Sequence, residues 1–166
     1  MRQVTFKGAA IELSGHLPQA GSTAPAFKLT GADLSDKEPV DFRGKAKILN
    51  IVPSLDTPVC AVSARKFSEE ISRRQNVVLL NISADLPFAQ KRFCESNGLK
   101  NVVTLSTFRS PAFGPDYGVL IASGPLTGLM SRAVVVLDSQ DKVLYVELVP
   151  EIAQEPDYAA ALSMLP

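Results

Sequence analysis

The sequence contains few of the side chains that bind metals, with one histidine and two cysteines among 166 residues. The usual zinc sites need more ligands than these three residues supply, and Cys60 and Cys94 lack the spacing of a CxxC pair. A Ser-His-Asp hydrolase would depend on His16, the only imidazole, in a loop near the N-terminus. These shortages argue against a zinc protein and against a serine hydrolase.

A surplus of charge of either sign is absent as well. Seventeen Lys and Arg residues balance seventeen Asp and Glu residues, whereas binding to nucleic acid or to an anionic membrane calls for a clear basic surplus. No apolar run approaches the ~18 residues of a transmembrane helix. Lys7 and Glu12 interrupt the N-terminal stretch where a signal peptide would have its apolar core. We therefore expect a cytoplasmic protein with neither nucleic acid nor a membrane as a partner.

The length and composition predict one folded unit. At ~100–200 residues per domain, the chain forms a single domain over residues 1–166. A chain of this length buries about 70% of the surface that it exposes when unfolded. Its hydrophobic fraction of 46% and charged fraction of 20% are ordinary for a soluble globular protein. In the cytoplasm, two cysteines are more often reactive thiols than a structural disulfide.

The hydrophobic pattern predicts alternating strands and helices behind a small N-terminal hairpin of Val4–Lys7 and Ile11–Leu13. The later elements that it predicts are strands over Ala46–Val52 and Asn76–Ser83, helices over Pro58–Arg74 and Pro87–Asn97, a short strand over Val102–Leu105, a hairpin of Ser131–Leu137 and Lys142–Val149, and a terminal helix over Asp157–Leu165. This is the element order of an α/β, thioredoxin-like fold with a mixed central sheet flanked by helices. Periodicity alone does not separate it from other small α/β sandwiches.

The segment PSLDTPVC, residues 53–60, joins a buried strand to a helix and carries the chemistry. Thr57 is a good N-cap residue, and Pro58 suits the first helical position. Cys60 then lies in the first turn, where free amides and the helix dipole favour a thiolate. A lone cysteine is more often a core residue, and Thr57 can be a plain N-cap. The position of Cys60 in the first turn nevertheless favours a reactive thiol.

This segment resembles the active-site motif of the thiol peroxidases, the atypical two-cysteine branch of the peroxiredoxins. Further segments that resemble the family are Gly21–Phe27 (GSTAPAF), Asp85–Cys94 (DLPFAQKRFC), Phe113–Gly118 and Gly124–Val134. The resemblance covers nearly the whole chain and includes both cysteines. It implies a thioredoxin-dependent hydroperoxide reductase that needs no cofactor and no metal.

The resemblance also implies a role for each site residue. Cys60 matches the peroxidatic cysteine, which attacks a peroxide and becomes a sulfenic acid. Thr57 matches the threonine that contacts thiolate and peroxide, Pro53 the proline that shields the thiolate from solvent, and Arg132 the arginine that activates the thiolate and orients the peroxide. The Thr57 hydroxyl, the Cys60 amide and the Arg132 guanidinium are suitable hydrogen-bond donors for the oxygen that departs.

Cys94 matches the resolving cysteine, which would form an intramolecular disulfide with Cys60. A disulfide needs Cα atoms about 4.4–6.8 Å apart, and thiols in the first turn of one helix and the middle of the next rarely meet that condition. We therefore expect oxidation to unwind partly the helix starts around Cys60 and Cys94. The alternative interpretation of Cys94 is a packed helix residue beside Phe93.

The resemblance further implies reduction by thioredoxin, a homodimer and a preference for organic hydroperoxides over hydrogen peroxide. Two alternatives stand beside it. A thiol–disulfide oxidoreductase is disfavoured because that chemistry usually uses a CxxC pair. A peroxide sensor or binding module would share the first chemical step, and only catalytic turnover separates it from a peroxidase.

Overall fold

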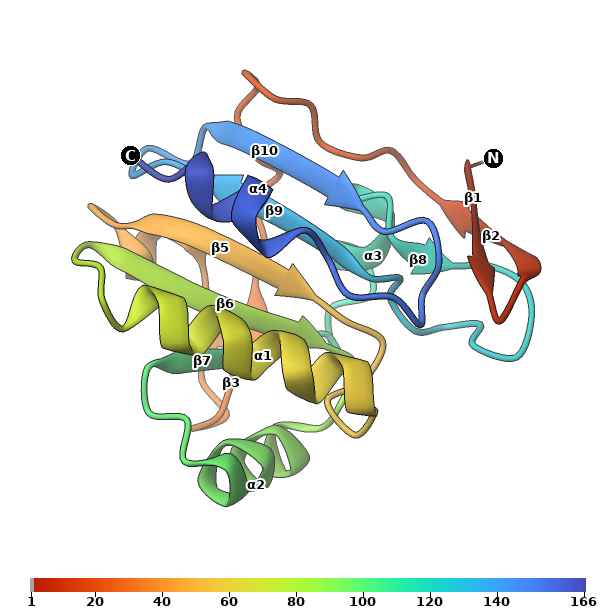
Figure 1. Ribbon diagram of the computed structural model, residues 1–166, viewed down its shortest axis with the longest axis horizontal. Helices are drawn as coiled ribbons and strands as arrows, with labels where there is room; N and C mark the ends of the chain where they lie inside the picture. The colour runs from red at the N-terminus through yellow and green to blue at the C-terminus, as the bar shows by residue number, and fades with distance from the viewer. Residues whose placement is uncertain (1) are drawn as a thin grey trace.

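A computed structural model describes residues 2–166, which form two β-sheets with helices packed around them (Figure 1). The elements are β1 (Arg2–Phe6), β2 (Ala9–Ser14), β3 (Leu29–Gly31), β4 (Asp36–Lys37), the 3-10 turn η1 (Pro39–Phe42), β5 (Ala46–Ile51), α1 (Pro58–Ile71), β6 (Val77–Ser83), α2 (Pro87–Asn97), β7 (Val102–Ser106), α3 (Phe113–Asp116), β8 (Leu120–Ile121), β9 (Ala133–Leu137), β10 (Val143–Leu148) and α4 (Tyr158–Ser163). None of the described helices has the length and apolar character that crossing a membrane requires.

The larger sheet is mixed, with the strand order β10-β9-β5-β6-β7-β3-β4. Strands β5, β6 and β7 run parallel and are connected by α1 and α2, while β9 runs antiparallel to β5. Three chain segments therefore meet at one edge, because Ile51 at the end of β5 pairs with Ile82 near the end of β6 and with Ala133 at the start of β9. This mixed sheet confirms the predicted fold class.

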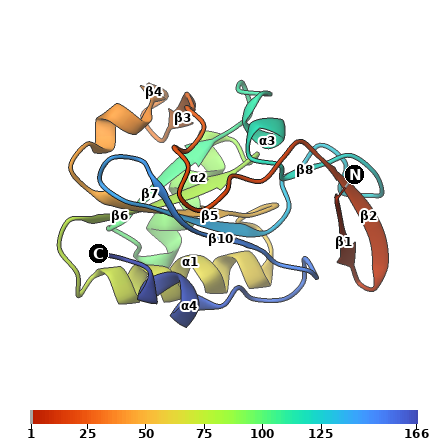
Figure 2. The same ribbon diagram turned by 90° about the horizontal axis from the view of Figure 1, so that it is seen from above.

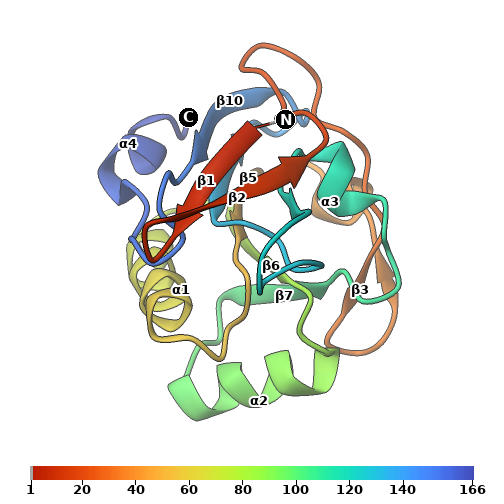
Figure 3. The same cartoon turned by 90° about the vertical axis from the view of Figure 1, so that its right-hand side faces the viewer.

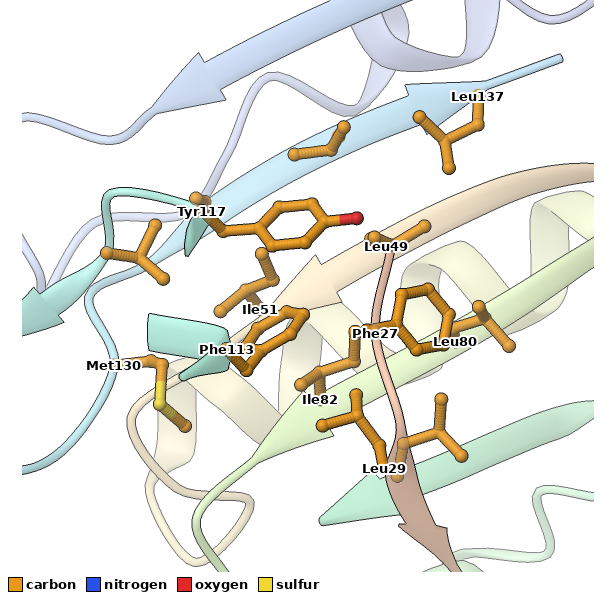
Figure 4. Packing of buried hydrophobic residues seen from close by; sticks show 14 of the residues in the cluster. Phe27, Leu29, Leu49, Ile51, Leu80, Ile82, Phe113, Tyr117, Met130 and Leu137 are labelled. Carbon is orange, nitrogen blue, oxygen red and sulfur yellow. The ribbon is translucent and has the colours of Figure 1, made fainter. Parts of the chain in front are cut away.

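Each face of the sheet has its own core. Alternate residues of a strand point to opposite faces, so Ile48 of β5 packs with Phe67 of α1, whereas Leu49 and Ile51 pack on the other side. Figure 2 shows α1 and α4 on one side of the sheet and α3 on the other. The second core is the larger one, and Figure 4 shows its packing around the rings of Phe27, Phe113 and Tyr117.

The N-terminal hairpin forms a separate sheet with β8 beyond the carboxyl ends of β5 and β6 (Figures 1 and 3). Its turn uses Lys7 and Gly8 at φ 51° and 82°, the left-handed region that suits a tight hairpin. The hairpin also binds the segment after β10, because the Thr5 amide donates to the Pro150 carbonyl at 2.8 Å and the Ile152 amide donates to the Thr5 carbonyl at 2.9 Å. The hairpin therefore fixes the backbone of this segment from Pro150 to Ile152.

Most predicted elements are confirmed, with small changes at their ends. Helix Pro87–Asn97 is present with the predicted bounds, and Gly98 caps it at φ 64°. Helix α1 ends at Ile71 instead of the predicted Arg74. The backbone forms a tighter turn there, in which the Arg74 amide donates to the Ile71 carbonyl three residues earlier. The predicted strand over Ser131–Leu137 begins two residues later, at Ala133.

Tyr117 gives a test of the larger core. Its hydroxyl donates to the Pro25 carbonyl at 2.8 Å, and burial, followed by the charges of Asp141 and Asp116, raises the pKa of Tyr117 so that it stays a donor. We expect Tyr117→Phe to lower the free energy of unfolding by about 1 kcal/mol, since a partly buried hydrogen bond is lost. Urea denaturation would measure this loss.

Tyr145→Phe is the matched control for that experiment. Tyr145 is also partly buried, but within residues 2–166 its hydroxyl makes no hydrogen bond to another side chain or to the backbone. It should therefore change the stability little. Equal stabilities for the wild type and the Tyr117 variant would show that the Pro25 contact contributes nothing.

Candidate active site

The loop between β5 and α1 places the segment 53–60 at the carboxyl edge of the sheet, where open α/β sheets have their ligand sites. The helix begins where the sequence predicts, with Thr57 in an extended conformation (φ −120°) as the N-cap residue and Pro58 at the first helical position. Cys60 is the third residue of α1 and lies in its first turn. Pro58 has no N–H, and the amides of Val59 and Cys60 make no hydrogen bond to other residues in the described part of the chain.

Thr57 is placed as expected, but its hydroxyl differs from the expectation. It makes no capping hydrogen bond to the helix. Instead, Thr57 Oγ1 donates to the Ser54 carbonyl oxygen at 3.0 Å. A hydroxyl has one proton to donate and two lone pairs. Since the proton goes to Ser54, the exposed Thr57 hydroxyl can still accept a hydrogen bond.

The Cys60 side chain is fully buried. It packs in a small cluster with Val52, Leu55 and Ala64, and Phe93 from α2 packs against this cluster. Pro53 is buried next to Val52. A cavity of about 260 Å³ lies outside this cluster, and its walls include Leu55, Asp85 and Phe93. Leu55 and Phe93 thus contribute both to the packing around the sulfur and to the surface of the cavity.

Arg132 is brought directly to Cys60. It precedes β9 by one residue, and the pairing of Ala133 with Ile51 puts it beside the start of the active-site loop. Its Nη2 lies 3.1 Å from the Cys60 sulfur, and its Nε donates to the Ile152 carbonyl at 2.8 Å. Arg132 is only 2% exposed, and its Nη1 is buried without a partner among residues 2–166.

The electrostatic consequence of this contact is clear. A buried charge without a partner of opposite charge is costly, and within residues 2–166 Arg132 makes no ion pair with a carboxylate. The Cys60 sulfur is the one ionisable group to which it hydrogen-bonds. A guanidinium at this distance is a hydrogen-bond donor for negative charge that develops at the sulfur or at an atom bound to it.

Cys94 lies apart from these residues. It is half-buried on α2 and, like Cys60, has a free thiol. It lines a different cavity, of about 500 Å³, together with residues of β7 and of the β3–β4 connection. Burial, and secondarily the charge of Glu95, raises the pKa of the Cys94 thiol, which therefore stays protonated at neutral pH. The structure brings Cys60 and Arg132 together, but not Cys60 and Cys94.

Two parts of the site were not predicted from the sequence. One is the Ile152 carbonyl, a backbone group that orients Arg132 and that no side-chain pattern reveals. The other is Asp85, which bonds to the active-site loop through Ser54 and Leu55. Its position just after β6 could have revealed it, because the carboxyl ends of parallel neighbours meet at one edge. In the described chain, no three His, Cys, Asp or Glu side chains gather as metal ligands.

A buried thiol in the first turn of a helix, in contact with a buried guanidinium on a thioredoxin-like sheet, defines a thiol-dependent redox enzyme. The redoxin family model matches residues 19–162. A thiol peroxidase from Mycobacterium tuberculosis is 55% identical over 165 residues, which is 99% of each chain.

Solved structures agree with this. A peroxiredoxin-like protein from Aquifex aeolicus superposes with a TM-score of 0.90 at 40% identity, covering 98% of this chain and 95% of that one. A thiol peroxidase from Chromobacterium violaceum superposes with a TM-score of 0.92 at 25% identity, covering 99% and 95%. The chain belongs to the redoxin family and, within it, to the thiol peroxidases, so its activity is the reduction of peroxides.

The Arg132 contact yields a prediction about the rate of oxidation. Arg132→Ala removes the hydrogen-bond donor beside the sulfur, so we expect the oxidation of Cys60 by a hydroperoxide to slow about a hundredfold. The measurement follows the intact mass over time after one equivalent of cumene hydroperoxide is added in a Cys94→Ser background, where Cys60 is the only thiol. Arg132→Lys, which keeps a positive charge, should lie between the two. Identical rates for the parent protein and the Arg132→Ala variant would show that the guanidinium does not act on the reaction.

Proposed function

We propose that this enzyme reduces hydroperoxides by a two-cysteine cycle in which Cys60 is the peroxidatic and Cys94 the resolving cysteine. The observation that carries the proposal is the 3.1 Å contact between Arg132 Nη2 and the Cys60 sulfur in a buried site. The same contact supports a second role for Arg132, because a guanidinium beside the sulfur can also donate to a peroxide oxygen that approaches it.

In the first step, the Cys60 thiolate attacks one peroxide oxygen, and the O–O bond breaks. The sulfur gains a hydroxyl group as a sulfenic acid, and the other oxygen leaves with the bonding pair and takes up a proton to become water or an alcohol. Negative charge therefore moves from the sulfur to the departing oxygen. Donors that are already fixed at that place lower the barrier without reorganising.

The neighbouring groups supply complementary contacts. The unpartnered Arg132 Nη1 and the free amides of the first turn are donors for the developing charge. Thr57, whose proton goes to the Ser54 carbonyl, accepts the hydrogen of the peroxide hydroxyl. Pro53, buried beside Val52, limits the access of water to the sulfur. The hydroperoxide approaches through the cavity between the loop and α2, past Leu55 and Phe93.

In the second step, the Cys94 sulfur attacks the Cys60 sulfenic acid, releasing water and forming an intramolecular disulfide. In the reduced protein Phe93 packs against the Cys60 cluster while Cys94 lines another cavity. The first turn of α1 and the part of α2 around Cys94, which is the eighth of its eleven residues, must therefore rearrange before the sulfurs meet. A dithiol protein, thioredoxin, then reduces the disulfide to two thiols. The enzyme works in the cytoplasm as a homodimer and uses no cofactor.

The decisive experiment adds one equivalent of an organic hydroperoxide, such as cumene hydroperoxide, to the reduced protein. We expect both free thiols to disappear within seconds and the intact mass to fall by that of two hydrogen atoms. Cys60→Ser should not react, since the nucleophile is missing. Cys94→Ser should be oxidised once, stop as a sulfenic acid and fail to turn over with thioredoxin. Two thiols that survive minutes of exposure would contradict the proposed cycle.

The rearrangement has its own test by hydrogen exchange. Because the turns around Cys60 and Cys94 must unwind for the disulfide to form, the hydrogen-bonded amides of these turns, which begin at Ala61 in α1 and at Gln90 in α2, should lose protection in the disulfide form, while the β5–β6 core keeps it. The reduced protein and the Cys94→Ser variant treated with peroxide are the controls. Unchanged protection of these amides in both helices would exclude the rearrangement.

A further inference from the structure

Asp85 joins the active-site loop to the helix that carries Cys94. It lies two residues after β6 and two residues before the first residue of α2. Its carboxylate accepts three hydrogen bonds of 2.7 Å, from the Ser54 hydroxyl, the Leu55 amide and the Ser83 hydroxyl. Two of these donors belong to the loop before Cys60 and the third to the end of β6. Hydrogen bonds to a carboxylate are shorter and about twice as strong as neutral ones.

The connection continues into α2. The Ser83 hydroxyl that donates to Asp85 also accepts from Gln90 Nε2 at 3.0 Å. Gln90 is fully buried, and the same amide nitrogen donates to the Leu105 carbonyl of β7 at 3.0 Å. Gln90 precedes Cys94 by one helical turn. The Asp85 backbone is fixed as well, because its carbonyl accepts from the Ser106 hydroxyl at 2.6 Å. We call Ser54, Asp85, Ser83 and Gln90 the Asp85 network.

The loop end of this network leads to the reacting groups. Asp85 bonds to the Ser54 hydroxyl, and the Ser54 carbonyl accepts the proton of Thr57. Asp85 also fixes the Leu55 amide, and Leu55 packs against the Cys60 side chain. Asp85 lies in the wall of the cavity outside the cluster, but its carboxylate bonds to the loop and to β6, and none of these hydrogen bonds goes to the Cys60 sulfur. It acts on the reacting groups through Ser54 and Leu55.

We propose that Asp85 is a positioning residue that keeps the loop before Cys60 and the start of α2 together in the peroxide-reactive arrangement and must release them before the disulfide forms. This inference rests on the proposed function, since it assigns opposite effects to one residue in the two steps of that cycle. The peroxide-reactive arrangement holds Thr57 and Leu55 in place for the attack on peroxide. The same arrangement keeps Cys60 and Cys94 in separate environments, which delays the second step.

The test compares Asp85→Ala and the isosteric Asp85→Asn with the wild type in single-turnover experiments. Cumene hydroperoxide is mixed with reduced enzyme, samples are quenched with acid, and intact mass distinguishes thiol, sulfenic acid and disulfide over time. In Asp85→Ala we expect attack on peroxide to slow about tenfold and disulfide formation from the sulfenic acid to accelerate by a similar factor. Asp85→Asn keeps the shape and part of the hydrogen bonding, so both of its rates should lie between those of Asp85→Ala and the wild type.

Asp138→Ala is the matched control. Asp138 is also a partly buried aspartate that accepts backbone hydrogen bonds, from Gln140 and Lys142 at 2.8 and 2.9 Å. It lies in the β9–β10 turn at the opposite end of β9 from Arg132. Asp138→Ala should lower the stability without changing either rate, because the hydrogen bonds of Asp138 stay within its own turn. Opposite changes of the two rates in the Asp85 variants would therefore not be explained by a general loss of stability.

Hydrogen exchange of the reduced proteins gives a measurement that needs no peroxide. In Asp85→Asn, the Leu55 amide of the active-site loop and the Gln90 amide of α2 should both exchange faster than in the wild type, whereas in Asp138→Ala they should not. This comparison also serves if Asp85→Ala does not fold.

The outcomes separate the two hypotheses. A wild type that forms no disulfide contradicts the proposed function itself. A normal wild type with both steps slowed together in the Asp85 variants, or with neither step changed, contradicts the positioning role alone. A slower first step with a faster second step, graded from the alanine variant through the asparagine variant to the wild type, supports it.

Discussion

The site depends on one interaction, the contact between the Arg132 guanidinium and the Cys60 sulfur inside the protein. Arg132 is 2% exposed and forms no ion pair within residues 2–166, and the sulfur is the side-chain atom to which it hydrogen-bonds there. Other parts of the fold hold the guanidinium there. The pairing of β9 with β5 places Arg132 at the carboxyl edge of the sheet, and the Ile152 carbonyl fixes its Nε.

This dependence explains the N-terminal hairpin, which contributes no side chain to the site. Thr5 binds the backbone on both sides of Glu151, and the Glu151 carboxylate accepts from Thr5 Oγ1 and from the Lys7 amide at 2.6 and 2.9 Å. These hydrogen bonds lower the pKa of Glu151 to about 2. Because that pKa is lowered, the contribution of the carboxylate is present above its unfolded value and disappears only as the pH falls toward 2. The hairpin therefore supports the segment that orients Arg132 throughout the physiological range.

The elements that could be predicted from the sequence have a regular hydrophobic pattern or strong local signals at their ends. Buried strands, the Thr57-Pro58 helix start and the Gly98 helix end have such signals, and they are observed where expected. Strands β3 and β8 and helix α3 are two to four residues long, too short to show a period, and were not predicted. The Ile152 carbonyl and the three donors to Asp85 also escaped prediction, because such contacts arise only when distant segments meet at one edge of the sheet.

The buried state of Cys60 has a consequence for the proposed two-step cycle. The packing of Leu55 and Phe93 around the sulfur excludes water and strengthens its hydrogen bond with Arg132, since electrostatic interactions are stronger in a less polar medium. The same packing puts Phe93, rather than its neighbour Cys94, against the Cys60 cluster. In the proposed cycle, this arrangement suits the attack on peroxide but not the disulfide, so the enzyme would have to change conformation between the two steps. Polar contacts that bridge the active-site loop and α2, such as those proposed for Asp85, can favour one of the two conformations without touching the reacting sulfur.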